Sequence, residues 1–353
     1  MTESVLILSN EQMEGLITMK EAIEAMEMAF REFGEGKAYL IPRGAIQIPK
    51  TTQPDAKYYF YHMAAALKAY NIMALRIDSR TLQVREVADM SREELPGDFV
   101  GLVLLFDIEN NELNAILHDG YLSPLRVAAT SGLVAQHLAR QNISVMGLFG
   151  AGVQARVHAK AMCEVRSIQL IKVYTPIPAD RESFAHDMTL ELGVQVQAMD
   201  MPRPVVEGSD IVVAATNSNE PVFRGEWLEP GTHVITIRGH EPYMKQWETD
   251  EATARRADVM VFNYAEVIKN GHLGLLPLLN EGALHWEDLH EVTDLVLGKC
   301  QGRSNDKQIT VHYNNIGLGI QWAAVAYIVH QRARGHGIGT EIPAELFITR
   351  QQK

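Results

Sequence analysis

The chain has 353 residues, of which 46% are hydrophobic and 22% are charged, and its formal net charge is −12. This length suggests about two domains, and the acidic balance argues against a nucleic-acid surface, which needs clustered Lys and Arg. Cys163 and Cys300 are far apart and lack the spacing of metal ligands, so we expect a reduced, cytoplasmic chain without a metal site. No signal peptide and no membrane-spanning segment is expected.

The N-terminal third is predicted to contain a short strand, one helix and then several further strands. Residues 4–8 suggest a short strand. Thr18 can cap a helix that has Glu21 at its capping-box position, and the apolar period continues to Gly34. After Ile41 the pattern indicates strands at 57–63, 73–77, 99–106 and 113–117, and residues 109–112 look like a hairpin connection between the last two.

From residue 125 onward, helices alternate with strands. A helix is predicted at 125–139 and another, after a glycine turn, from Val153 to residue 164. Further strands are expected at 168–174, 194–197, 211–215, 233–237 and 259–262, with a helix at 180–192. Alternation at this spacing predicts a parallel, doubly wound sheet. A last helix at 321–334 lies beyond this sheet, and we expect it to return to the first domain.

The glycine turn at 150–155 has the pattern of a dinucleotide-binding turn. Gly150, Gly152 and Ala155 match G-x-G-x-x-G/A, and Val153 and Gln154 would form the first helical turn, whose free N–H groups can hold a pyrophosphate. A structural turn is the alternative, but the surrounding strands and helices favour nucleotide binding. The predicted fold is α/β: a Rossmann doubly wound sheet at 126–317, inserted into a strand-rich α+β dimerisation and substrate domain formed by 1–125 and 318–353.

Several motifs together resemble the ornithine cyclodeaminase/mu-crystallin family. The most specific are Asp119-Gly-Tyr-Leu-Ser-Pro-Leu-Arg-Val-Ala-Ala-Thr-Ser131 and Gly147-Leu-Phe-Gly-Ala-Gly-Val-Gln-Ala155; Ala214-Ala-Thr-Asn-Ser218, Gly231-Thr-His-Val-Ile235 and the segment from Asn315 to Gln321 follow in family order. The resemblance implies a homodimer, a nicotinamide cofactor, and hydride transfer at a carbon that bears nitrogen. It does not decide the substrate.

The resemblance assigns a substrate carboxylate to Arg43 and Arg126, and guanidinium groups suit a planar carboxylate because each can bond both oxygens. Where the family usually has a lysine, this chain has Arg76, which keeps the charge but cannot exchange a proton. Arg76 could still clamp a carboxylate or stabilise charge. Lys68 is an alternative for the missing lysine.

Two further positions depart from the cyclodeaminases. Tyr61 stands where they have a glutamate for the distal amine, and His240 replaces an aspartate that is thought to handle a proton. Since histidine exchanges protons near neutral pH, His240 is the first candidate for the catalytic acid, with His62 and Tyr61 behind it. Glu241 is adjacent but would point elsewhere.

The strand that ends at Tyr174 lacks the acidic residue that usually bonds an NAD ribose. Thr175 is there instead, Arg181 could contact a 2′-phosphate, and Asp180 is expected to cap the next helix. NADP(H) is therefore favoured, with NAD(H) possible. Thr216 and Asn217 are predicted to border the cofactor because they follow a strand of the sheet.

The sequence thus predicts an NAD(P)H-dependent oxidoreductase that reduces the C=N bond of a small, carboxylated imine, or oxidises the corresponding amine. Two alternatives stay open. One is ammonia-releasing cyclisation of ornithine, and the other is a non-catalytic, crystallin-like protein that binds NADPH. No nucleic-acid or membrane partner is expected.

Overall fold

The computed structural model describes residues 4–53, 55–87, 90–94, 97–238, 248–265, 275–314 and 316–349. The chain divides into two compact units. The first unit comprises Met1–Gln83, Leu95–Arg126 and Leu318–Lys353, and the second comprises Val84–Glu94 and Val127–Gly317. The expected division had assigned residues 84–94 to the first domain, whereas here they cluster with the second unit.

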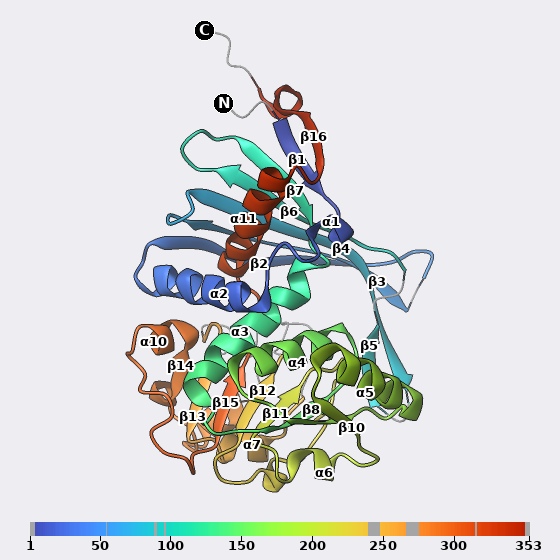
Figure 1. Cartoon of the computed structure of the whole chain (residues 1–353), viewed down its shortest axis with the longest axis vertical. Coiled ribbons are helices and arrows are strands. Elements are labelled where there is room, and N and C mark those ends of the chain that lie inside the picture. The colour runs from blue at the N-terminus through green and yellow to red at the C-terminus, as the bar shows by residue number, and fades with distance from the viewer. Residues whose placement is uncertain are drawn as a thin grey trace. The chain divides into compact units, whose positions relative to one another are not determined.

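The first unit is built on a mixed sheet with the strand order β16-β1-β7-β6-β4-β3-β2, and β5 pairs with β4 (Figure 1). Neighbouring strands on this path are antiparallel except β1 and β7, which are parallel. The strands are β1 (Ser4–Leu8), β2 (Ala38–Pro49), β3 (Ala56–Leu67), β4 (Ile72–Val87), β5 (Met90–Glu94), β6 (Val100–Asp107), β7 (Leu113–His118) and β16 (Thr340–Pro343). The strands predicted in this part of the chain match β1, β3, β4, β6 and β7.

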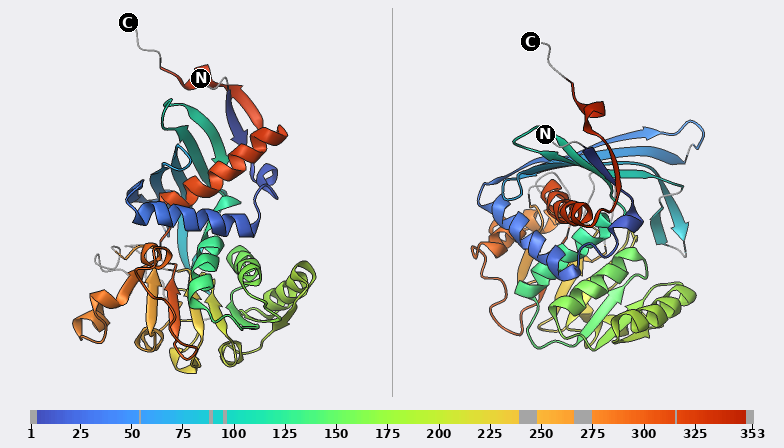
Figure 2. Two further views of the ribbon diagram at one scale, coloured as in Figure 1. Left: turned by 60° about the vertical axis from the view of Figure 1, so that its left-hand side comes forward. Right: turned by 45° about the horizontal axis from the view of Figure 1, so that its top comes forward.

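Helices α2 and α11 pack on the first sheet (Figure 2). The capping box predicted for α2 is present, because the Glu21 amide donates to the Thr18 hydroxyl and the Thr18 amide donates to the Glu21 carboxylate. Helix α11 approaches β3 so closely that a Cβ on Gly319 would lie 2.5 Å from the carbonyl carbon of Ala64. The helices are α1 (Asn10–Met13), α2 (Met19–Gly34), α11 (Gly319–His336) and the 3-10 helix η3 (Ala344–Phe347).

The second unit contains a sheet with the order β10-β9-β8-β11-β12-β15-β13-β14, in which every described pair is parallel. The chain winds outward from β8 through β9 to β10 and then restarts on the other side at β11, which is the predicted doubly wound Rossmann topology. The strands are β8 (Val145–Phe149), β9 (Leu170–Tyr174), β10 (Gln195–Ala198), β11 (Ile211–Ala214), β12 (His233–Thr236), β13 (Val259–Phe262), β14 (Leu289–Glu291) and β15 (Thr310–Tyr313).

Helix α3 begins in the first unit and continues into the second, and the remaining helices belong to the second unit. Helix α4 follows β8 and α5 follows β9, as the sequence predicts. The helices are α3 (Leu122–Leu138), α4 (Val153–Val165), α5 (Pro178–Leu192), α6 (Arg203–Val206), α7 (Glu251–Arg255), α9 (Leu276–Asn280) and α10 (Val292–Val296), with 3-10 helices η1 (Gly225–Trp227) and η2 (Trp286–Asp288).

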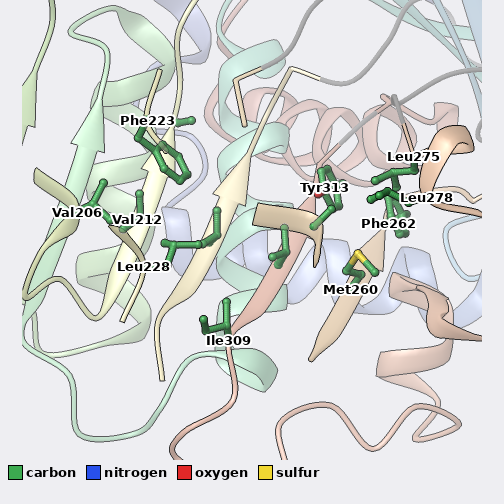
Figure 3. Close-up of a cluster of buried hydrophobic side chains, with 14 of the residues drawn as sticks. Val206, Val212, Phe223, Leu228, Met260, Phe262, Leu275, Leu278, Ile309 and Tyr313 are labelled. Carbon is green, nitrogen blue, oxygen red and sulfur yellow. The ribbon is translucent and has the colours of Figure 1, made fainter. Parts of the chain in front are cut away.

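A cluster of buried apolar side chains packs on one face of the second sheet (Figure 3). Val212 of β11, Phe262 of β13 and Tyr313 of β15 contribute to it, and Phe262 stacks on Tyr313 with ring centroids 4.9 Å apart. Because side chains alternate along a strand, the neighbouring His312 points to the opposite face, where its Nε2 lies 3.1 Å from the Asn263 amide oxygen. None of the described helices combines the length and apolar character that a membrane crossing requires.

Candidate functional site

A pocket of about 690 Å³ lies at the carboxyl ends of β8, β9 and β11 in the second unit. This is the switch point where the strand order reverses, and open α/β sheets bind their ligands there. The lining residues include seven predicted for cofactor binding, namely Gly150, Gly152, Val153, Gln154, Thr175, Thr216 and Asn217. The other lining residues are Phe149, Ala151, Tyr174, Pro176, Asp180, Pro202, Ala215, Ser218, Pro221 and Val222.

The two glycines of the turn meet different requirements. Gly150 has φ +105°, and a Cβ there would lie 2.3 Å from the carbonyl oxygen of Ala215, so only glycine fits. Gly152 is the N-cap of α4 and provides no side-chain cap. A Cβ on Gly152 would meet no protein atom within 4 Å, so the glycine keeps the backbone open to the pocket. Uncapped N–H groups at the positive end of a helix dipole suit a phosphate.

The rest of the predicted cofactor set is divided between the pocket and its support. Ala155 is fully buried and does not line the pocket, which agrees with a helix-packing role. Arg181 is also buried, and its guanidinium donates to the Thr175 carbonyl at 3.2 Å and to Asp200 at 2.8 Å. It is not among the pocket-lining residues.

The expectation that Asp180 caps α5 is wrong. The N-cap is Ile177, and Asp180 lies in the first turn because Pro178 opens the helix earlier than expected. Proline is favoured at the first helical position, where its missing N–H is not needed. As a result, Asp180 lines the pocket beside Thr175.

A buried polar chain, which sequence reasoning missed, ends at the pocket. It consists of Ser131, His158, Asn263, His312 and Asn314. His158 Nδ1 lies 2.7 Å from the Gln154 carbonyl oxygen, and its Nε2 lies 3.0 Å from the Ser131 hydroxyl. The Asn314 amide nitrogen lies 2.9 Å from the same hydroxyl. The Asn263 amide nitrogen lies 2.6 Å from the Asn314 amide oxygen, and His312 Nε2 lies 3.1 Å from the Asn263 amide oxygen.

Three backbone carbonyls fix the direction of every bond in this chain. The carbonyls of Val127, Gln154 and Ile316 can only accept, so Asn314, His158 and Asn263 must donate to them. His158 therefore carries its proton on Nδ1 and accepts from the Ser131 hydroxyl at Nε2.

Both histidines of the chain are neutral at physiological pH. Burial lowers the pKa of His158 to about 4. Burial, followed by the repulsion of His158, lowers that of His312 to about 3.

The first unit contains an arginine cluster, consisting of Arg43, Arg76, Arg80 and Arg126, around two aromatic rings. The guanidinium carbons of Arg43, Arg76 and Arg80 lie 3.8, 4.5 and 5.5 Å from the Tyr61 ring centroid. Those of Arg76 and Arg126 lie 4.8 and 5.0 Å from the Trp322 ring. These distances are within the range of cation–π interactions.

Two buried aspartates organise this cluster. Arg76 donates its Nε to Asp119 at 2.8 Å and also pairs with Asp78, which in turn pairs with Arg80. Burial acts to lower the pKa of Arg76, but Tyr61, Asp119 and Asp78 together hold it above the ordinary value. Arg76 is therefore a fixed cation enclosed by carboxylates.

The pKa of Arg126 is shifted in the opposite direction from that of Arg76. Burial, followed by the positive charge of Arg76, lowers the pKa of Arg126 to about 9. It donates to the Gln321 amide oxygen at 3.0 Å. The guanidinium is still charged at neutral pH, and an incoming anion would stabilise it.

The candidate catalytic residues are not all brought together. Tyr61 pairs across the strands with Asp78 and faces the arginine cluster, whereas its neighbour His62 pairs with Ile77 on the other face. A Cβ on Gly44 would lie 2.5 Å from His62 Nε2, so the imidazole covers that glycine. Lys68 is exposed and lies over Tyr39, with 5.5 Å from Nζ to the ring centroid. His240 and Glu241 lie outside the described residues.

Within the described ranges, no group of three or more His, Cys, Asp or Glu side chains is arranged to hold a metal ion. Both cysteines are free thiols.

Comparison with known proteins gives full-length matches. The alanine dehydrogenase of Archaeoglobus fulgidus is 29% identical over 343 residues, which cover 96% of this chain and 98% of that protein. The structure of Thermococcus litoralis Delta(1)-pyrroline-2-carboxylate reductase in complex with NADH and L-proline has a TM-score of 0.84 at 29% identity, with 96% of this chain and 100% of that chain covered. An archaeal alanine dehydrogenase dimer with bound NAD has a TM-score of 0.81 at 27% identity, with coverage of 96% and 99%.

Residues 3–337 match the model of the ornithine cyclodeaminase/mu-crystallin family, which confirms the resemblance carried by the motifs. The chain belongs to the ornithine cyclodeaminase/mu-crystallin family.

Proposed function

We propose that this protein is an NAD(P)H-dependent oxidoreductase that reduces the C=N bond of a small carboxylated imine, or oxidises the corresponding amine. The observation that carries the proposal is the pocket at the β8/β11 switch point, with Gly150 in a conformation that only glycine tolerates and an uncapped helix start beside it. Two relatives, a Delta(1)-pyrroline-2-carboxylate reductase with bound NADH and L-proline and an alanine dehydrogenase with bound NAD, each match 96% of the chain.

A nicotinamide dinucleotide, when bound, supplies or accepts the hydride. The residues that would hold it are Gly152, Val153 and Gln154 at the pyrophosphate, together with Thr216 and Asn217, which follow β11. The pocket fits such a group because the protein places no atom within 4 Å of a Cβ at Gly152.

Arg43 and Arg126 are proposed to bind the substrate carboxylate. Arg126 gains most from an anion, because burial and the charge of Arg76 lower its pKa. Arg76 is proposed to hold the cluster together rather than to transfer a proton, since its guanidinium is enclosed by Asp78 and Asp119 and stays charged. The proposed proton donor is His240, with Tyr61 as second candidate.

The cluster also disfavours a diamino acid substrate. A distal ammonium would need an anionic partner, and the position where cyclodeaminases carry a glutamate holds Tyr61, whose ring lies against three guanidinium groups. Like charges repel, so ornithine cyclisation is not the proposed reaction.

For the cofactor, two features of the pocket favour NAD(H) over the NADP(H) expected from the sequence. Asp180 lines the pocket beside Thr175, where a carboxylate would repel a 2′-phosphate and could bond a ribose hydroxyl. Arg181, the residue expected to receive that phosphate, is instead paired with Asp200.

We further propose that the protein acts as a cytoplasmic homodimer. Strand β2 is the edge of the first sheet and exposes Tyr39, Ile41, Ile46 and Ile48, each more than half accessible. An apolar edge strand is a template for pairing with another chain, and a relative of the same fold is described as a dimer. Two free thiols are consistent with a reducing compartment.

The test is a steady-state assay of NADH and NADPH oxidation with cyclic ketimine acids, the pyrroline- and piperideine-carboxylates. Turnover on one of them is expected. Failure with every ketimine and both cofactors would contradict the proposal. Ammonia release from ornithine without added reductant would instead support cyclodeamination, and dinucleotide binding without any turnover would support a crystallin-like role.

A further inference from the structure

Glu248 is a buried carboxylate that connects the dinucleotide pocket to the next strand of the sheet. Glu248 is 1% exposed, and it is not part of any of the motifs that identify the family. One carboxylate oxygen accepts from the Thr216 amide at 2.6 Å and from the Thr216 hydroxyl at 2.7 Å. The other accepts from the Thr236 hydroxyl at 2.9 Å and from the amides of Ile237 and Arg238 at 3.0 Å each.

These five donors come from the carboxyl ends of two adjacent parallel strands. Thr216 follows β11 and lines the pocket, whereas Thr236 ends β12. Three of the five partners are backbone amides, which can only donate, and each carboxylate oxygen faces at least one of them. Burial raises the pKa of Glu248, but both of its oxygens must accept, and a carboxylate has the lone pairs for this. An amide of the same shape would set its NH2 group against at least one backbone N–H, which cannot accept.

Hydrogen bonds within the protein engage both the hydroxyl and the backbone N–H of Thr216. Its hydroxyl donates to Glu248 and accepts from the Ser218 amide at 3.1 Å. Its backbone N–H is likewise engaged by Glu248. The backbone carbonyl of Glu248 accepts from the amide of Val222, another pocket residue, at 3.0 Å. Glu248 thus bonds two pocket-lining residues: Thr216 through its carboxylate and Val222 through its backbone carbonyl.

We propose that Glu248 is a positioning residue for dinucleotide binding: it sets the wall formed by Thr216 to Val222 against the glycine turn. This inference rests on the proposed function, because it assigns the pocket to a dinucleotide. Glu248 itself is not a pocket-lining residue and acts through Thr216 and Val222.

The test compares E248Q with a matched control, D210N. Asp210 accepts from the backbone amides of Ser144 and Val145 at 2.9 and 3.0 Å. It precedes β11 and so lies at the amino ends of the strands, opposite the pocket. Both changes replace a carboxylate that holds backbone N–H groups in the same sheet, but only Glu248 holds the pocket wall.

The measurement is the Kd of the full-length protein for NADH and for NADPH by nicotinamide fluorescence, together with Tm. E248Q is expected to raise the Kd of the preferred dinucleotide about tenfold or more, which is the effect of misplacing one or two hydrogen bonds. D210N is expected to lower Tm while its Kd stays within about twofold of wild type. Equal changes in Kd for the two variants, or an unchanged Kd for E248Q, would overturn the proposal.

If E248Q does not fold, T236V provides the second arm. Valine has the shape of threonine, and Thr236 is buried away from the pocket, so this change removes one of the five hydrogen bonds to Glu248. An increase in Kd of about threefold supports the proposal, and no increase refutes it. Absence of dinucleotide binding by the wild-type protein would instead contradict the proposed function.

Discussion

Replacing His158 with leucine should destabilise the second unit in a way that depends on pH. At pH 7 the variant loses the hydrogen bond from Ser131 and the one to the Gln154 carbonyl, which measure 3.0 and 2.7 Å. The Ser131 hydroxyl is then buried without its acceptor. At about 1 kcal/mol for each lost bond, plus the desolvation of an unsatisfied group, the expected loss is about 2–4 kcal/mol of unfolding free energy.

At lower pH the difference between wild type and variant should shrink. The pKa of buried His158 is about 4, compared with 6.5 for an unperturbed histidine. Below pH 6.5 the unfolded chain therefore takes up a proton that the native chain refuses until pH 4, so wild-type stability falls across this window. pH 5 is about 1.5 units below the pKa of an unperturbed histidine, so wild type loses about 2 kcal/mol of unfolding free energy there. The leucine variant does not lose this stability.

Urea unfolding followed by circular dichroism at pH 7 and pH 5 measures both effects. His186→Leu is the control, because His186 is exposed on α5; its unfolding free energy is expected to stay within about 0.5 kcal/mol of wild type. A His158→Leu variant as stable as wild type at pH 7 would refute the hydrogen-bond assignment. If the difference in unfolding free energy between wild type and His158→Leu is the same at both pH values, the conclusion that His158 is buried and neutral is refuted.

Three further predictions concern the substrate, the cofactor and the assembly. Arg126→Met should raise KM for a carboxylated imine about 50-fold, because a charge-assisted bond contributes about 1.5–3 kcal/mol, and steady-state kinetics would show it; a KM that stays constant contradicts the carboxylate role. Asp180→Ser should improve NADPH binding relative to NADH about tenfold by removing a like charge beside the 2′-phosphate, and an unaltered ratio of the two Kd values would exclude Asp180 from that choice. The double change of Ile46 and Ile48 to Lys should reduce the mass measured by light scattering from twice the 39.4 kDa chain mass to the chain mass itself, whereas a persistent dimer would place the interface elsewhere.

The sequence was most informative where the chemistry is local. The helix start at Thr18 and the turn at Gly150 depend on residues within a few positions of each other, and both were predicted. Strand spacing likewise indicated the doubly wound order. Local reasoning was wrong for Asp180, since the helix begins earlier, at Pro178, and Asp180 is a pocket-lining residue of its first turn.

Contacts between distant residues could not be predicted in the same way. The sequence does not show that Asp200 would engage Arg181, nor that Asp78 and Asp119 would enclose Arg76. Strand alternation could have separated Tyr61 from His62, since neighbours on a strand face opposite sides. The buried polar chain had a weaker signal: Ser131 and His158 stand within or beside the family motifs, but their pairing depends on how α3 and α4 pack.

The bond between Asn314 and Val127 has a consequence for the history of the molecule. The larger segment of the second unit runs from its entry at Val127 to its exit at Gly317, and Val84–Glu94 is a separate segment of the same unit. The Asn314 side chain holds the Val127 carbonyl at 2.9 Å, so the entry and the exit are neighbours. A domain whose ends adjoin can be added to a host in a single insertion event, because the host needs to open at only one place. Exchange of the segment from 127 to 317 between relatives would therefore transfer all the pocket-lining residues as one block, whereas residues 84–94 of the same unit would stay with the host.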